Sequence, residues 1–181
     1  MDLWSWAVAA YGRPGVAPAA LALQDEHGQC VPLLLWGAFA RPADPDVIGE
    51  AVSLARTWER AAILPLRAAR RNLKSPLPGA DTGPREALRD QVKAAELAAE
   101  RLLLAALAPL GPGVRDAGPP LAVLQAIAKA WGPTSPGAPD ALSAGLTRLS
   151  AALSHPPDPG DPAAAIGDGL SGPLPRAGKT G

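Results

Sequence analysis

The sequence is poor in the residues that favour β-strands. Val, Ile and Thr together supply 17 of the 181 residues, whereas Leu and Ala supply 65. Strand-forming residues are therefore scarce and helix-forming residues abundant. This shortage argues against an all-β fold, and against a parallel α/β sheet, whose buried strands need runs of Val and Ile. We expect an all-α protein.

Cysteine, long apolar runs and excess charge are also missing. Cys30 is the only cysteine, which excludes an intrachain disulfide and favours a reducing compartment. The N-terminus lacks the Lys or Arg of a secretory signal, and the longest uncharged run, residues 27–40, is too short to span a bilayer. The formal net charge is zero, and general nucleic-acid binding depends on excess positive charge. These absences predict a cytoplasmic protein without a membrane segment and disfavour nucleic-acid binding.

Pro and Gly, which make up 41 residues, divide the chain into helical segments. We expect helices at about 2–11, 16–26, 32–39, 44–74, 84–108, 120–131 and 139–153. Pro65 lies inside the fourth segment and predicts a kink or break near Leu64. The expected fold is an irregular helical bundle of about five to seven helices, forming one domain over residues 1–153. Residues 154–181 contain 6 Pro and 6 Gly and are expected to form a disordered tail.

No motif predicts catalysis or a bound cofactor. Gly178-Lys179-Thr180 resembles the end of a phosphate-binding loop, but the first glycine of that motif would fall on Pro173. His27 and Cys30 could supply two metal ligands, whereas a closed zinc site needs four. The same two residues lack the third, orienting group of a nucleophilic pair. We therefore expect no metal site, no cofactor and no catalytic residue; enzymatic activity is left open, and a protein that is not an enzyme is favoured.

A basic stripe is the strongest surface signal. Residues 56–74 carry a net charge of +5, which the rest of the chain balances with −5. On a straight helix, successive residues are about 100° apart, and six basic residues then fall within one arc that also contains Ile63. These six residues form the basic stripe: Arg56, Arg60, Arg67, Arg70, Arg71 and Lys74. An apolar face lies opposite and consists of Ala51, Ala55, Trp58, Ala62, Leu66, Ala69 and Leu73.

The stripe has two interpretations. Arginine forks bind carboxylates and phosphates, so the stripe can serve as an anion or protein-partner site. Alternatively, it is simply solvated, or paired within the fold with acidic residues such as Glu96 and Glu100; this second interpretation is the favoured one, because charged helix faces usually face solvent. As a function, we expect a non-enzymatic adaptor that uses this basic face to bind a protein. Weak nucleic-acid binding through the same stripe is a further alternative, and the oligomeric state is left open.

The tryptophans suggest another alternative, a small-molecule-binding bundle with possible hydrolytic activity. Its pocket would lie between the Trp-bearing helices. The candidate pocket residues are Trp4, Gln24, Asp25, Trp36 and Trp58. Tryptophans in apolar helical segments more often belong to the core than to a ligand site, so the adaptor hypothesis is preferred.

Several short motifs occur together in a specific order. They include Trp4, Tyr11, Pro14-Gly15-Val16, Leu21-Ala22-Leu23-Gln24-Asp25, Trp58, Pro65-Leu66-Arg67, Arg70, Glu96-Leu97 and Glu100-Arg101. In these motifs, residues 2–107 resemble a bacterial family of small helical proteins that is known only as a domain of unknown function. The resemblance implies a helical domain and no activity.

Overall fold

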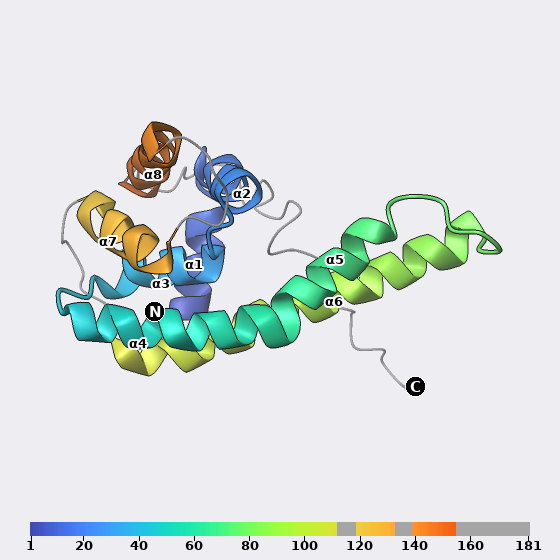
Figure 1. Ribbon diagram of the computed structural model, residues 1–181, viewed down its shortest axis with the longest axis horizontal. Coiled ribbons are helices and arrows are strands. Elements are labelled where there is room, and N and C mark those ends of the chain that lie inside the picture. The colour runs from blue at the N-terminus through green and yellow to red at the C-terminus, as the bar shows by residue number, and fades with distance from the viewer. Residues whose placement is uncertain (112–118, 133–138, 155–181) are drawn as a thin grey trace, which may run out of the picture.

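The computed structural model describes residues 1–111, 119–132 and 139–154, and all regular elements in these ranges are helical. The α-helices are α1 (Leu3–Tyr11), α2 (Val16–His27), α3 (Val31–Ala40), α4 (Pro45–Trp58), α5 (Leu64–Asn72), α6 (Thr82–Leu107), α7 (Leu121–Trp131) and α8 (Pro139–Ser154) (Figure 1). A π-helical turn, η1 (Glu59–Ile63), joins α4 to α5, and a 3-10 turn, η2 (Ala108–Leu110), follows α6. The predicted all-α class is confirmed. The expected disordered tail lies, from residue 155 onwards, outside the described residues.

The helix ends follow the capping signals of the sequence. Asp2 accepts a hydrogen bond from the Ser5 amide at 3.0 Å at the start of α1, and Asp44 accepts one from the Asp46 amide at 2.9 Å at the start of α4. Gly28 ends α2 with a φ of 59°, a left-handed conformation that glycine adopts at little cost. Among the described helices, none has both the length and the apolar character that crossing a bilayer requires.

Helix α3 forms the centre of the core. Nine of its ten residues are buried, and Trp36 is completely so. This burial is possible because α1, α2, α6 and α7 pack around α3. Because neighbouring helices cover α3, its sequence is apolar on all sides.

Helices α7 and α8 complete the core beyond residue 107. Helix α7 crosses α3 at Gly37, where an added Cβ would lie 2.0 Å from Ile127 Cδ1. Helix α8 packs on α2, with Gly145 against Leu23. The Trp131 indole N–H donates a hydrogen bond to the Gly28 carbonyl at 2.9 Å and so links the end of α7 to the end of α2.

The rod formed by α4, η1 and α5 shifts its buried face by one residue at the π turn. A straight helix would bury the predicted apolar positions Trp58, Ala62, Leu66 and Ala69. The structure instead buries the positions one residue later, Glu59, Ile63, Arg67 and Arg70. A π turn contains about one residue more than an α turn, so the side chains after it are rotated by about 100°. The break expected near Leu64 is this π turn, and it corrects the straight-helix geometry assumed for the basic stripe.

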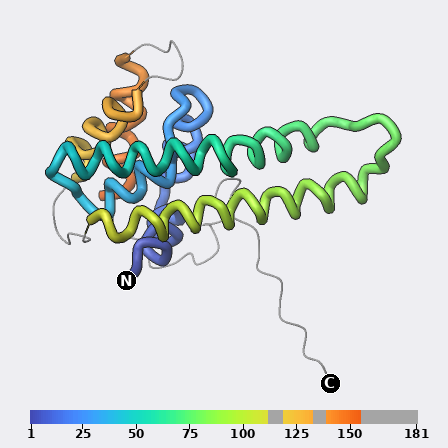
Figure 2. The backbone as a smooth tube through the Cα atoms, turned by 60° about the horizontal axis from the view of Figure 1, so that its bottom comes forward, coloured from blue at the N-terminus to red at the C-terminus, as the bar shows by residue number. Residues whose placement is uncertain are grey.

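A two-helix arm projects from the bundle. We define it as residues 71–95, which comprise the end of α5, the following loop and the first half of α6. Both views show it extending away from the other helices (Figures 1 and 2). Within these residues only Leu73 is buried. At the end of α5, the Arg85 guanidinium lies 2.8 Å from the carbonyl oxygens of Leu73 and Lys74, and these contacts close the hairpin.

Candidate functional site

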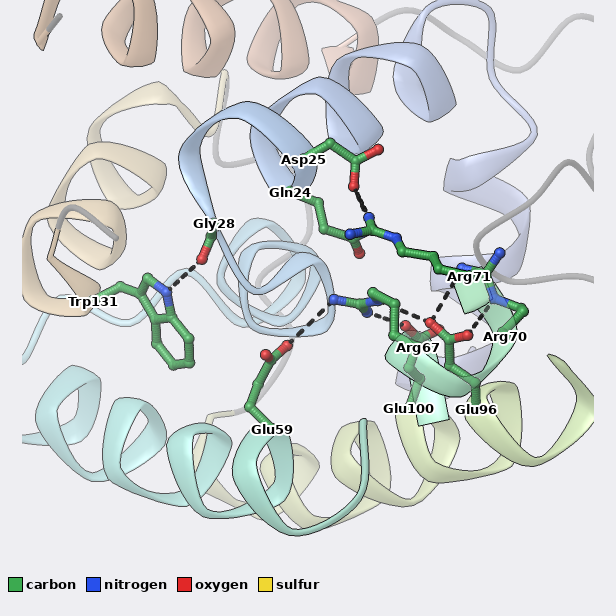
Figure 3. Close-up of polar contacts among 10 residues, drawn as sticks. All are labelled: Gln24, Asp25, Gly28, Glu59, Arg67, Arg70, Arg71, Glu96, Glu100 and Trp131. Atoms are coloured by element: carbon green, nitrogen blue, oxygen red, sulfur yellow. Dashed lines mark hydrogen bonds and ion pairs between the residues drawn. The ribbon is translucent and has the colours of Figure 1, made fainter. Parts of the chain in front are cut away.

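Two arginines of the basic stripe meet three glutamates inside the protein, at the base of the arm. Arg67 and Arg70 project from α5, Glu96 and Glu100 from α6, and Glu59 from the π turn (Figure 3). All five side chains are buried, with side-chain exposures between 3% and 8%. We call these five residues the buried ion cluster.

Arg67 is the centre of the cluster. Its Nε donates to Glu96 Oε1 at 2.9 Å, its Nη2 donates to Glu100 Oε1 at 3.0 Å, and its Nη1 lies 4.0 Å from Glu59 Oε1. Arg70 donates from Nε to Glu96 Oε2 at 2.5 Å. A single guanidinium thus contacts three carboxylates, which its planar arrangement of five donors permits.

The local sequence explains how the cluster forms. Glu96 and Glu100 are four residues apart on α6, and Arg67 and Arg70 are three apart on α5, so each pair lies on one helix face. The one-residue shift at the π turn rotates the arginine pair towards the glutamate pair. Sequence reasoning named Glu96 and Glu100 as possible partners of the stripe, and the structure shows these ion pairs for Arg67 and Arg70.

Burial dominates the electrostatics of the cluster. It raises the pKa of Glu100 to about 8, although the charge of Arg67 acts in the opposite direction. Burial also raises the pKa of Glu59, although the charge of Arg67 acts in the opposite direction. The Tyr11 pKa is raised to about 12, chiefly by burial and then by the charge of Glu100. The carboxylates therefore compete for too few positive charges in a medium that disfavours ionisation.

The other members of the basic stripe lie apart from the cluster. Arg56 donates to the Trp131 carbonyl and has its guanidinium carbon 5.0 Å from the centre of the Trp131 ring. The Arg60 Nε donates to the Arg56 carbonyl at 3.2 Å, and its side chain is exposed. Arg71 pairs with Asp25, and Lys74 is exposed on the arm. The six residues consequently do not form one continuous surface, because Arg67 and Arg70 are inside the protein.

The candidate pocket residues are distributed between the core and its edge. Trp36 is completely buried, whereas Trp58 is partly buried and packs against the core. Trp4 is also partly buried and lies beneath Arg101, at 5.3 Å from ring centre to guanidinium carbon. Gln24 and Asp25 are neighbours at the end of α2, where Asp25 is directed towards Arg71 (Figure 3).

The remaining candidates, His27 and Cys30, are both buried. Burial raises the pKa of the Cys30 thiol well above its usual value, and the nearby charge of Glu59 raises it further. In the part of the chain that the structure describes, no group of three or more His, Cys, Asp or Glu side chains could hold a metal ion.

Sequence reasoning did not identify Glu59 or Tyr11 as parts of a site. Two signals pointed to Glu59. Ile63 interrupted the basic arc, and Pro65 required a local departure from α-helical geometry. Both are explained by a shifted helix face, on which Glu59 and Ile63 are buried together. For Tyr11, the sequence offered its position in an apolar helix and its place among the motifs of the family resemblance, and neither indicates a neighbouring carboxyl.

A family model described as Protein of unknown function (DUF2390) matches residues 2–107. The match includes every residue of the buried ion cluster and the whole arm. It ends before α7 and α8, which supply further core residues such as Ile127 and Leu149. Neither the curated proteins nor the solved structures contain a match to this chain.

Proposed function

The chain belongs to the DUF2390 family of proteins of unknown function, and we propose that it is a non-enzymatic adaptor that binds a protein partner through its projecting arm. The observation that carries this proposal is the exposure of the arm. Within residues 71–95 only Leu73 is buried, so the arm adds little to the hydrophobic core. A helical hairpin that extends from the bundle in this way presents two helix faces to a partner.

The arm combines apolar and basic side chains. Leu77 and Leu88 are 43% and 48% exposed. Lys74 is exposed at the start of the loop, and Arg71 is exposed while it pairs with Asp25. This combination suits a partner that has an apolar contact surface next to acidic side chains.

The buried ion cluster supports the arm from below. Arg67 and Arg70 join α5 to α6 at the point where the hairpin leaves the bundle, and so fix its direction. A rigid support lowers the entropy cost of binding, because fewer conformations are lost when the partner docks. In this proposal the two buried arginines position the arm, and the exposed residues contact the partner.

Paired variants test the proposal. The arm variant is Lys74→Glu with Leu88→Ser, and the control is Lys129→Glu with Leu102→Ser. The control changes the same residue types at exposed positions of α7 and α6 outside the arm. We expect affinity purification from the native cell, read by mass spectrometry, to recover one partner with the wild type and the control but not with the arm variant.

Identical partner sets for all three proteins, with unchanged circular dichroism, would reject the arm as the binding element. Recovery of nucleic acid in place of a protein would reject the protein-partner assignment. In that case the affinity of the protein for the nucleic acid should fall steeply as the salt concentration rises.

We also infer that the protein is bacterial and works in the cytoplasm. The family resemblance of the sequence supports a bacterial origin. The lone, buried Cys30 supports a reducing compartment, since secreted domains commonly use cysteines in pairs. Fractionation of the native cell with an antibody against the protein tests the location, and recovery in the periplasmic or extracellular fraction would contradict it.

A further inference from the structure

The buried ion cluster contains three carboxyl groups but only two guanidinium groups. If all five ionised, a net negative charge would lie inside the protein, where an unpaired charge is costly. Helix α3, which forms the centre of the core, has no charged residue to offset it. One added proton makes the cluster electrically neutral.

Hydrogen-bond geometry and burial together identify the carboxyl that holds this proton. Both oxygens of Glu96 accept from guanidinium nitrogens, at 2.9 Å and 2.5 Å, so Glu96 is held as the carboxylate. Glu59 lies with its Oε1 4.0 Å from Arg67 Nη1, and this oxygen is buried without a hydrogen-bond partner among the described residues. Glu100 accepts a hydrogen bond on Oε1, whereas its Oε2 is likewise buried and has no partner among the described residues. The Glu100 side chain is 3% exposed and that of Glu59 is 8% exposed, so Glu100 is the more deeply buried of the two and the one for which ionisation costs more.

We propose that the buried ion cluster is a proton-binding site in which Glu100 holds a proton on Oε2 near neutral pH, and that release of this proton weakens the attachment of α5 to α6. In the protonated state, Oε1 still accepts from Arg67, and the cluster contains two positive and two negative charges. Release leaves a buried, unbalanced carboxylate at the base of the arm. The proposal does not depend on the adaptor function, because its test involves no partner.

The other titratable groups around Glu100 do not supply the missing positive charge. Tyr11 on α1 and Cys30 before α3 are buried, and each stays neutral with a raised pKa. On α2, Asp25 is paired with Arg71. The raised pKa of Glu100, about 8, agrees with a group that takes up the proton itself.

The sign of the pH effect follows from proton linkage. Glu100 has a higher pKa in the folded protein, about 8, than its ordinary value of 4.5, so the folded state binds more protons between these values. Raising the pH through this window therefore destabilises the fold. From pH 6 to pH 8, this single group should increase the unfolding equilibrium constant on the order of 50-fold.

Glu100→Gln provides the direct test, since glutamine has the shape of the protonated acid and cannot ionise. We expect the variant to lose the component of the pH dependence that Glu100 causes in the wild type between pH 6 and pH 8. Denaturant unfolding at a series of pH values measures this. Glu86→Gln is the matched control because it removes an exposed carboxyl from the same helix. It should retain the wild-type profile.

A second measurement does not depend on whether the variant folds. In wild-type protein labelled with carbon-13 at the glutamate carboxyl carbon, the Glu100 signal should titrate with a midpoint near pH 8. A midpoint in the range of an exposed glutamate would overturn the proposal. Parallel stability profiles for the wild type and Glu100→Gln from pH 6 to pH 8 would also overturn it.

Discussion

Replacing Arg67 by Met should strongly lower the free energy of unfolding, whereas the same replacement at Arg60 should have almost no effect. Both arginines belong to the predicted basic stripe, and methionine keeps much of the length of the side-chain stem while it removes the charge. Arg67 is 5% exposed and contacts three carboxylates, whereas Arg60 is exposed and donates only to a backbone carbonyl.

The magnitude follows from the contacts that are lost. Removing one partner from a buried ion pair costs about 3–5 kcal/mol, because the remaining charge stays buried without compensation. Arg67→Met leaves the buried charge of Glu59 without a guanidinium partner and removes the donor to Glu100 Oε1, so we expect the upper part of that range. An exposed substitution changes the free energy of unfolding by about 0.5 kcal/mol or less. For a domain stabilised by about 5–15 kcal/mol, the difference between the two variants is easily measured.

Urea unfolding at pH 6, followed by circular dichroism, is the appropriate assay. With a slope of about 2 kcal/mol per molar urea, Arg67→Met should lower the midpoint by about 2 M, and Arg60→Met should leave it within error of the wild type. Arg70→Met, which leaves only Glu96 short of a donor, should lie between them. Equal midpoints for the Arg60 and Arg67 variants would refute the shifted helix face on which the site depends.

Three further predictions concern packing, the arm and titration. Gly37→Ala should destabilise the protein by about 1–3 kcal/mol in thermal unfolding, because the new Cβ would overlap Ile127; Gly49→Ala has open space and should stabilise α4 instead. Arg85→Ala should increase amide hydrogen exchange at the tip of the arm while global stability falls by less than about 1 kcal/mol, since the lost bonds are local. Tyr11 is the only tyrosine, so its ultraviolet titration should show a midpoint at about 12; a midpoint near 10 in folded protein would contradict its burial.

Most of the fold was predictable from local signals. The caps at Asp2 and Asp44 and the left-handed turn at Gly28 mark helix ends to within a residue or two. The helix expected at about 32–39 has an almost continuous apolar sequence, which is typical of a helix in the middle of a bundle, and α3 is such a helix. These features depend on a few neighbouring residues, so one sequence is enough to read them.

The site was harder to predict because it depends on helix phase. The projection of residues 51–74 onto a straight helix placed Arg67 and Arg70 on the solvent side. One extra residue in the π turn, just before Pro65, rotates both into the interior. The sequence indicates that a break occurs there, but the extent of the rotation depends on tertiary packing. An error of one residue in phase is enough to exchange a charged surface for a buried cluster.

The composition of α5 and α6 explains why a charged cluster is useful at the base of the arm. Burying ion pairs is a poor way to gain stability, since well-packed apolar residues often do as well or better. However, the alanines of these helices supply little apolar contact here, since Ala68 and Ala69 on α5 and Ala98 on α6 are exposed and only the small Ala99 is buried. Such limited apolar contact defines the alignment of two helices only weakly. The contacts of Arg67 with Glu96 and Glu100 permit only one alignment of α5 along α6. If α5 slid along α6 by one helical turn, the guanidinium would be separated from these two carboxyl groups, and all three groups would stay buried without their partners. The cluster thus sets how the hairpin begins, and thereby the direction in which the arm leaves the bundle.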